Sequence, residues 1–186
     1  SVPNNPNATT LQYTTPAEAK NQRDIVAAAT DFISNPSNDA TCTPVGLQFK
    51  HLCTAVIIKT GEQMTAGTIK SVSLKGIKNS GTYDMVSSAW TLNGTTTNFT
   101  ISPNQATTST TPNGTDLNAG ESTFMLLPQT LGADSKLEVA FHDNISGKDR
   151  ILSASLNGAV WPMGKTVTYR LSITPEYELK FTSEPE

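Results

Sequence analysis

Two histidines, His51 and His142, are the side chains best suited to acid–base chemistry at neutral pH. His142 is followed directly by Asp143, a pairing in which a carboxylate could orient a catalytic base. No serine, however, lies in a Gly-x-Ser-x-Gly turn that would supply a nucleophile. The two histidines also fall in different predicted strands. We therefore expect no catalytic residues, and we expect His51 to be a strand or bulge residue whose ring bonds a backbone carbonyl.

The carboxylates and cysteines that could bind a metal ion are spaced unlike known metal-binding motifs. Asp134, Asp143 and Asp149 do not form the closely spaced Asp-x-Asp-x-Asp loop of a calcium site, and Cys42 and Cys53 lack zinc spacing. We expect the carboxylates to lie in turns, with no metal site and no cofactor. The two cysteines either form one bridge or leave Cys53 as a small buried thiol, the commoner fate in a strand-like segment.

The composition is more typical of an exported β-protein than of a cytosolic enzyme. Charged residues are only 16% of the 186 residues, the formal net charge is −3, and Thr, Ser and Asn take the place of Lys and Glu. Lysines and arginines are scattered, so we expect no nucleic-acid partner. No apolar run reaches 18 residues, which excludes a predicted membrane span. No leader peptide opens the chain, so we expect an export signal to have been removed.

The clearest structural element runs from residue 166 to residue 173. Apolar and polar residues alternate strictly there, which is the period of a strand with one buried face. Pro162 and Gly164 precede it, so we expect Trp161 to lie at a sheet corner and to cap the core. The predicted buried face consists of Val167, Tyr169, Leu171 and Ile173.

A second long strand is predicted over residues 46–59, but its buried face is ambiguous. One register contains Leu47, Phe49, Cys53, Ala55 and Ile57. The opposite register is apolar as well, through Val56 and Ile58. Either both faces are covered at that end, or a bulge near His51 shifts the register.

Short strands separated by Gly, Asn and Pro signals recur along the rest of the chain. Asn93-Gly94 predicts a hairpin between strands at residues 83–92 and 96–101, and residues 103–118 are predicted to form a long surface loop. About nine such strands predict an all-β fold, a Greek-key β-sandwich of about seven to nine strands. We divide the chain into an N-terminal arm at 1–23, a single sandwich domain at 24–182, and a tail or cut linker at 183–186.

Five segments carry a resemblance to a known family. They are residues 24–28, 45–52, 69–74, 124–129 and 161–171, reading Asp-Ile-Val-Ala-Ala, Val-Gly-Leu-Gln-Phe-Lys-His-Leu, Ile-Lys-Ser-Val-Ser-Leu, Phe-Met-Leu-Leu-Pro-Gln, and Trp161 through Gly164-Lys165 to Tyr169 and Leu171. In this order and spacing the chain resembles the fimbrillin-type pilins and anchored surface proteins of Gram-negative gut and oral anaerobes. The resemblance covers roughly residues 24–174.

The resemblance implies a transthyretin-like sandwich, exported as a lipoprotein to the cell surface or outer membrane. The implied function is a pilus subunit or related anchored adhesin rather than an enzyme, and the alternative is a surface lipoprotein of the same fold that binds a glycan or host ligand. Its partners would be other pilus subunits or host and bacterial surface ligands. We expect membrane contact only through a lipid anchor, and position 1 is not the cysteine that would carry it. The resemblance would also place a second sandwich domain after Phe181, so we expect the chain to be either a mature or truncated piece or a shorter relative.

The resemblance further implies assembly by strand exchange. Fimbrillin-like pilins are thought to lose an N-terminal strand to a trypsin-like protease, and a strand from a neighbouring subunit then fills the groove. Lys20 and Arg23 are the only basic residues before position 50, and we expect maturation by cleavage after Arg23. The alternative is that Arg23 is simply an exposed residue on a helical turn. The predicted strand-exchange surface consists of Ile25, Val26, Val56 and Ile58.

Overall fold

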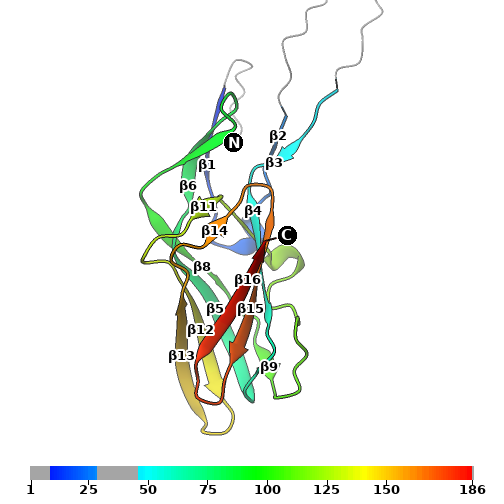
Figure 1. Cartoon of the computed structure of the whole chain (residues 1–186), viewed down its shortest axis with the longest axis vertical. Coiled ribbons are helices and arrows are strands. Elements are labelled where there is room, and N and C mark those ends of the chain that lie inside the picture. Colours follow the sequence, from blue (N-terminus) through cyan, green and yellow to red (C-terminus); the bar gives the residue numbers. More distant parts are fainter. Residues whose placement is uncertain (1–8, 29–45, 186) are drawn as a thin grey trace, which may run out of the picture.

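Two β-sheets packed face to face form the body of the protein (Figure 1). The computed structural model describes residues 9–28 and 46–185. The first sheet has the strand order β10-β4-β15-β16, with β4 and β15 parallel and the other pairs antiparallel. Its strands are β10 (Phe124–Leu126), β4 (Thr54–Thr60), β15 (Thr166–Ile173) and β16 (Leu179–Pro185).

The second sheet contains five antiparallel strands, in the order β13-β12-β5-β8, with β9 pairing the start of β5. Two irregularities interrupt its registers, one between Ala140 and Phe141 and one between Leu74 and Ile77. Its strands are β13 (Lys148–Ser155), β12 (Lys136–Asp143), β5 (Gly67–Lys78), β8 (Thr96–Ile101) and β9 (Gln105–Thr107).

Three smaller sheets lie beyond the upper end of the sandwich in Figure 1 or at its rim. The three-stranded one is β1 (Thr10–Thr14), β6 (Ser80–Asp84) and β7 (Ala89–Leu92). The two-stranded ones pair β2 (Val26–Ala27) with β3 (Lys50–His51), and β11 (Gln129–Thr130) with β14 (Val160–Trp161). Two single 3₁₀ turns complete the described chain, η1 (Ala19–Asn21) and η2 (Gly120–Ser122).

The main core lies between the two large sheets, and β15 supplies the face that its alternation predicts. Val167, Tyr169, Leu171 and Ile173 are all buried. The Trp161 indole N–H donates a 2.9 Å hydrogen bond to the Tyr169 hydroxyl, so two large buried side chains satisfy each other's polar atoms. An all-β sandwich is therefore confirmed, whereas the transthyretin-like Greek-key topology stays a prediction.

The structure decides between the two interpretations of the 46–59 segment. Val56 and Ile58 are fully buried in the main core, Leu47 and Phe49 are exposed, and Ile57 is half-buried. The physical reason is a break in the strand at Leu52 and Cys53, which separates β3 from β4 and buries two consecutive side chains. A register shift near His51 was one of the two interpretations, and it is the one observed.

Three predictions about local structure were also wrong. Residues 83–92 are not one strand, because the chain turns after Asp84 and returns as β7, with the Asp84 carboxylate accepting bonds from the N–H groups of Val86 and Ser87. Asn93-Gly94 consequently joins strands of different sheets instead of closing a hairpin. The predicted 103–118 loop contains β9, which pairs β5.

Two isoleucines of β4 test the observed register. Ile58→Ala removes a fully buried side chain and should lower the free energy of unfolding by about 2 to 5 kcal/mol. Ile57→Ala makes the same chemical change at the half-buried neighbouring position and should cost less than half as much. Urea unfolding followed by tryptophan fluorescence measures both values. Equal midpoints for the two variants would contradict the register.

Candidate functional site

The N-terminal segment, part of the predicted arm, is built into the small three-stranded sheet. Strand β1 pairs antiparallel with β6 along five residues, from Thr10 opposite Asp84 to Thr14 opposite Ser80. Leu11 is 8% exposed and packs with Leu52 and Tyr83 in a small cluster, here called the satellite core. Removing β1 would therefore expose both an edge of backbone groups on β6 and part of an apolar cluster.

Backbone hydrogen bonds extend this pairing beyond both ends of β1. The N–H of Met85 donates to the carbonyl of Thr9 at 2.8 Å, and the N–H of Thr15 donates to the carbonyl of Asn79 at 2.7 Å. The Thr15 side chain fits less well, because its buried Oγ1 has no hydrogen-bond partner within the described residues. An unpaired buried hydroxyl costs free energy, so the polar end of the Thr15 side chain does not help to hold this segment.

Gln22 connects the N-terminal segment to the first large sheet. Its side chain is 5% exposed, and its Oε1 accepts a 2.7 Å bond from the N–H of Met125 in β10. Its Nε2 donates to the carbonyl of Pro16 at 2.9 Å. Both ends of the amide are therefore used, and the side chain is fixed between η1 and the edge of the sheet.

Arg23, the predicted cleavage site, is exposed. Its guanidinium donates two 2.8 Å hydrogen bonds, to the carbonyls of Lys20 and Gln22 in its own segment. A hollow of about 490 Å³ opens beside it, lined by η1, residues 22–24, and residues around η2. The peptide bond after Arg23 thus lies on the surface, as a protease substrate requires.

The residues that follow Arg23 hold the chain against β3. Asp24 pairs with the Nδ1 of the exposed His51 ring, and the carbonyl of Ile25 accepts a 2.8 Å bond from the N–H of Leu52. Val26 then pairs opposite His51 at the start of β2. The prediction for His51 was wrong in one respect, because its partner is a carboxylate and not a backbone carbonyl.

The four residues of the predicted strand-exchange surface do not form one surface. Ile25 is half-buried beside the satellite core, and Val26 is 47% exposed. Val56 and Ile58 lie in the main core, on β4 between β10 and β15. Their apolar register is the core-facing side of the sheet, so neither side chain is available to an added strand.

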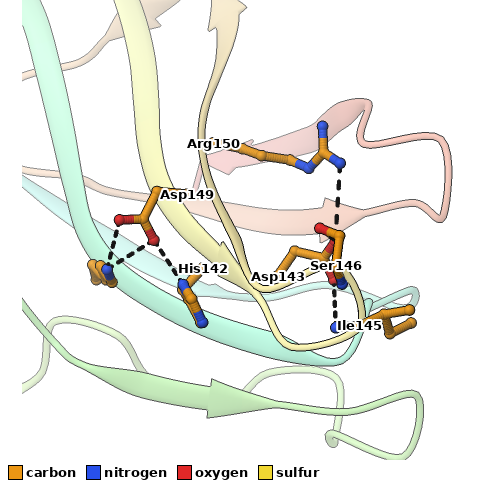
Figure 2. A network of polar contacts seen from close by, with 7 residues as sticks. His142, Asp143, Ile145, Ser146, Asp149 and Arg150 are labelled. Carbon is orange, nitrogen blue, oxygen red and sulfur yellow. Dashed lines mark hydrogen bonds and ion pairs between the residues drawn. The ribbon is translucent and has the colours of Figure 1, made fainter.

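His142 and Asp143, the other pair that suggested chemistry, belong to two separate polar groups at the opposite end of the sandwich (Figure 2). His142 contacts Asp149 on the outer face of the second sheet, with 2.7 Å between Nδ1 and Oδ1. Lys70 donates to the same carboxylate at 2.8 and 2.9 Å. The bond from Lys70 is the larger cause, and the bond from His142 the next, of a pKa of Asp149 below its usual value.

Asp143 is a buried residue at the end of β12, not a turn residue as predicted. It accepts bonds from the N–H groups of Ile145 and Ser146 and from the Ser146 hydroxyl (Figure 2). It also accepts a 2.6 Å bond from the Tyr177 hydroxyl. The Ser146 hydroxyl, followed by the Tyr177 hydroxyl, keeps the pKa of Asp143 far below its usual value. Arg150 lies 3.6 Å from the centre of the Tyr177 ring. The carboxylate therefore ties the β12–β13 turn to the β15–β16 turn.

These groups offer no ready metal site. Within residues 9–28 and 46–185, no group of three or more His, Cys, Asp or Glu side chains is arranged to bind a metal ion. The arrangement that bears on function is the N-terminal segment, where the exposed Arg23 follows β1, an edge strand of the small three-stranded sheet. Sequence reasoning singled out Arg23 but missed Gln22 and Met125, because a single glutamine carries no signal for a contact with a strand about a hundred positions away.

Comparisons with known proteins agree with this architecture. A family model described as fimbrillin-like matches residues 2–185. Two solved structures, candidate cell adhesion proteins from Bacteroides uniformis and Bacteroides ovatus, superpose with a TM-score of 0.59 at 16% identity. The superpositions cover 97% and 100% of this chain but only 67% and 62% of the solved chains. No curated protein matches the chain in sequence.

Cys53 should be unreactive in the folded protein. It is 2% exposed, and burial raises the pKa of its thiol to about 11, so little thiolate exists at neutral pH. Alkylation without reductant, followed by mass spectrometry, should leave Cys53 unlabelled until guanidinium is added. Cys42 lies outside the described residues, and a peptide linking it to Cys53 would contradict the prediction of a free thiol.

Asp143→Asn should lower the melting temperature by several degrees near pH 7. Because the folded-state pKa of Asp143 lies below the usual value of about 3.9, the ionised carboxylate stabilises the fold above that value, and the effect is lost as pH falls through the folded-state pKa. The difference from wild type should stay constant between about pH 7 and pH 5 and shrink below about pH 4. Asp149→Asn, at an exposed position of the same hairpin, is the control and should have a smaller effect.

Proposed function

The chain belongs to the fimbrillin-like family, and from this premise we propose that it is an exported, adhesive cell-surface protein that assembles as a pilus subunit. The family match over residues 2–185 is the observation that carries the proposal. The adhesion role of the two structural neighbours is consistent with it, although at 16% identity these neighbours inform only the fold.

Maturation of this subunit begins with cleavage after Arg23. The cut releases the N-terminal segment, including β1, from a short pairing of five residues with β6. The backbone donors and acceptors of β6 become unpaired, and the satellite core loses Leu11. A strand from another subunit restores both kinds of contact, which is the general mode of β-augmentation.

Other subunits are the partners in this proposal, and the cell surface is the location. No helix of the described part of the chain is long and apolar enough to cross a membrane. Attachment to the outer membrane would use a lipid anchor or an anchored partner. The partners and the location are inferred for this chain from its membership of the family.

Binding of a glycan or host ligand is the second candidate function. One observation favours it, a groove of about 370 Å³ on the outer face of the β15–β16 pair. Arg170, Ser172, Lys180 and Thr182 lie along it and offer hydrogen-bond donors to hydroxyl or carboxylate groups. Such a ligand would bind without cleavage of the chain.

Limited trypsin digestion tests the pilus proposal. Cleavage after Arg23 should yield a new N-terminus at Asp24, and size-exclusion chromatography with light scattering should show the cut protein moving from monomer to higher oligomers. N-terminal sequencing separates this cut from one after Lys20, which would begin at Asn21. Arg23 resisting trypsin, or a cut monomer with an unchanged melting temperature, would remove the proposal.

A further inference from the structure

We propose that Asn93-Gly94 is a self-modification site, at which the Asn93 amide is converted to aspartate and isoaspartate with water as the only co-reactant, and that the isoaspartate form loosens the small three-stranded sheet from the body of the protein. The inference is independent of the proposed function, because it concerns the chemistry of the link between β7 and β8.

The reaction needs only a side-chain amide followed by an accessible backbone nitrogen. The nitrogen of Gly94 attacks Cγ of Asn93, a new N–Cγ bond forms, and the Cγ–Nδ2 bond breaks. Nδ2 leaves as ammonia and takes the proton of the Gly94 nitrogen with it. Water then opens the succinimide ring. Addition of water at Cγ gives aspartate, and addition at the backbone carbonyl carbon gives isoaspartate, in which the backbone runs through the former side chain.

Three Asn-Gly pairs occur in the sequence, so the local sequence does not select one of them. They are Asn93-Gly94, Asn113-Gly114 and Asn157-Gly158, and all three asparagines are exposed. In each pair the glycine leaves its nitrogen unshielded by a side chain. The fold must therefore decide which pair reacts.

Two of the pairs are held in fixed turns. The N–H of Gly114 donates a 2.8 Å bond to the Thr60 carbonyl, and the N–H of Gly158 donates a 2.9 Å bond to the Leu131 carbonyl. Both glycines have a positive φ, of 88° and 80°. Neither nitrogen can turn toward the preceding side chain without first losing its hydrogen bond, which carries a free-energy cost.

Gly94 is under neither constraint. Its N–H makes no hydrogen bond to another residue that the structure describes, and its φ lies outside the left-handed region. Nothing lies within 4 Å of the position that a Cβ would take, so the surrounding space is open. The Asn93 amide is held by one exposed 3.1 Å bond, from its Nδ2 to the Ser80 hydroxyl. The two reacting atoms are therefore free to approach to the near-attack separation of about 3 to 3.5 Å.

Asn93 also lies where the two connections between the small sheet and the second sheet meet. The chain passes from β5 to β6 through Asn79, and from β7 to β8 through residues 93–95. The N–H of Asn93 donates a 2.9 Å bond to the Ser80 carbonyl, and the Asn93 side chain bonds the hydroxyl of the same serine. Isoaspartate removes the Nδ2 donor and lengthens the backbone by one methylene group. The link between the two sheets is thereby slackened.

Incubation of the folded full chain in mildly alkaline buffer tests the site. Digestion under mildly acidic conditions, followed by chromatography and mass spectrometry, measures the aspartate and isoaspartate formed at each asparagine. Because a misplacement of about 1 Å can cost on the order of 100-fold in rate, we expect Asn93 to react at least about tenfold faster than Asn113 and Asn157. Equal rates, or a faster reaction at Asn113 or Asn157, would overturn the proposal.

The same chain unfolded in guanidinium is the control. Without the turns that hold Gly114 and Gly158, the three pairs should react at similar rates. If Asn93 kept its full advantage in the unfolded chain, the selection by the fold would be wrong.

Gly94→Ala tests the attacking atom. The added Cβ meets open space and the backbone there does not require glycine, so the variant should fold like the parent. The Cβ shields the nitrogen, and conversion of Asn93 should fall severalfold. Conversion at the parent's rate would overturn the succinimide route.

Hydrogen exchange tests the loosening of the small sheet. The isoaspartate form, purified from aged protein, should exchange the amides of β6 and β7 faster than fresh protein, whereas β12 should be unchanged. Asn93→Asp supplies the charge without the longer backbone and should exchange more slowly than the isoaspartate form. Isoaspartate protein that exchanges like fresh protein, or like Asn93→Asp, would overturn this part of the proposal.

Discussion

The parallel pairing of β4 and β15 is the constraint on which the first sheet depends. The two strands are more than a hundred residues apart, yet they pair from Ala55 opposite Thr166 to Thr60 opposite Leu171. Together they contribute Val56, Ile58, Val167, Tyr169, Leu171 and Ile173 to one buried face. Parallel neighbours cannot be joined by a tight turn, so the intervening chain must leave and return, and it does so by building the second sheet.

That central pair leaves two edges, and the protein closes them by different means. The β16 edge is a long strand with exposed polar side chains. The β10 edge is a strand of three residues, supplemented by the side-chain amides of Gln22 and Asn118. A side-chain amide can satisfy a backbone group at one position without offering the continuous ladder that would recruit another strand.

The opposite end of the sandwich is held by a compact polar cluster. Asp143 joins the two hairpin turns through the Tyr177 hydroxyl, and Tyr177 itself has a positive φ of 60°. A tyrosine in the left-handed region carries a conformational cost, which the hydrogen bond to Asp143 and the stacking of Arg150 offset. At one end of the sandwich, Asp143 thus joins two turns of the chain. At the other end, β1 is attached at the edge of its sheet by backbone bonds to β6 and by the packing of Leu11.

The sequence by itself determined the all-β class and the buried face of residues 166–173. Both follow from local alternation of apolar and polar residues, which needs no knowledge of distant partners. Tertiary structure decided which face of β4 meets the core, because both registers are apolar and only the break at Leu52 and Cys53 selects one. It also decided that Asn93-Gly94 joins different sheets, that β1 pairs β6, and that Gln22 reaches Met125. These are contacts between segments that are distant in the sequence. The alternation of side chains along one strand carries no information about which other strand, or which side chain, will hydrogen-bond to the backbone groups at its edge.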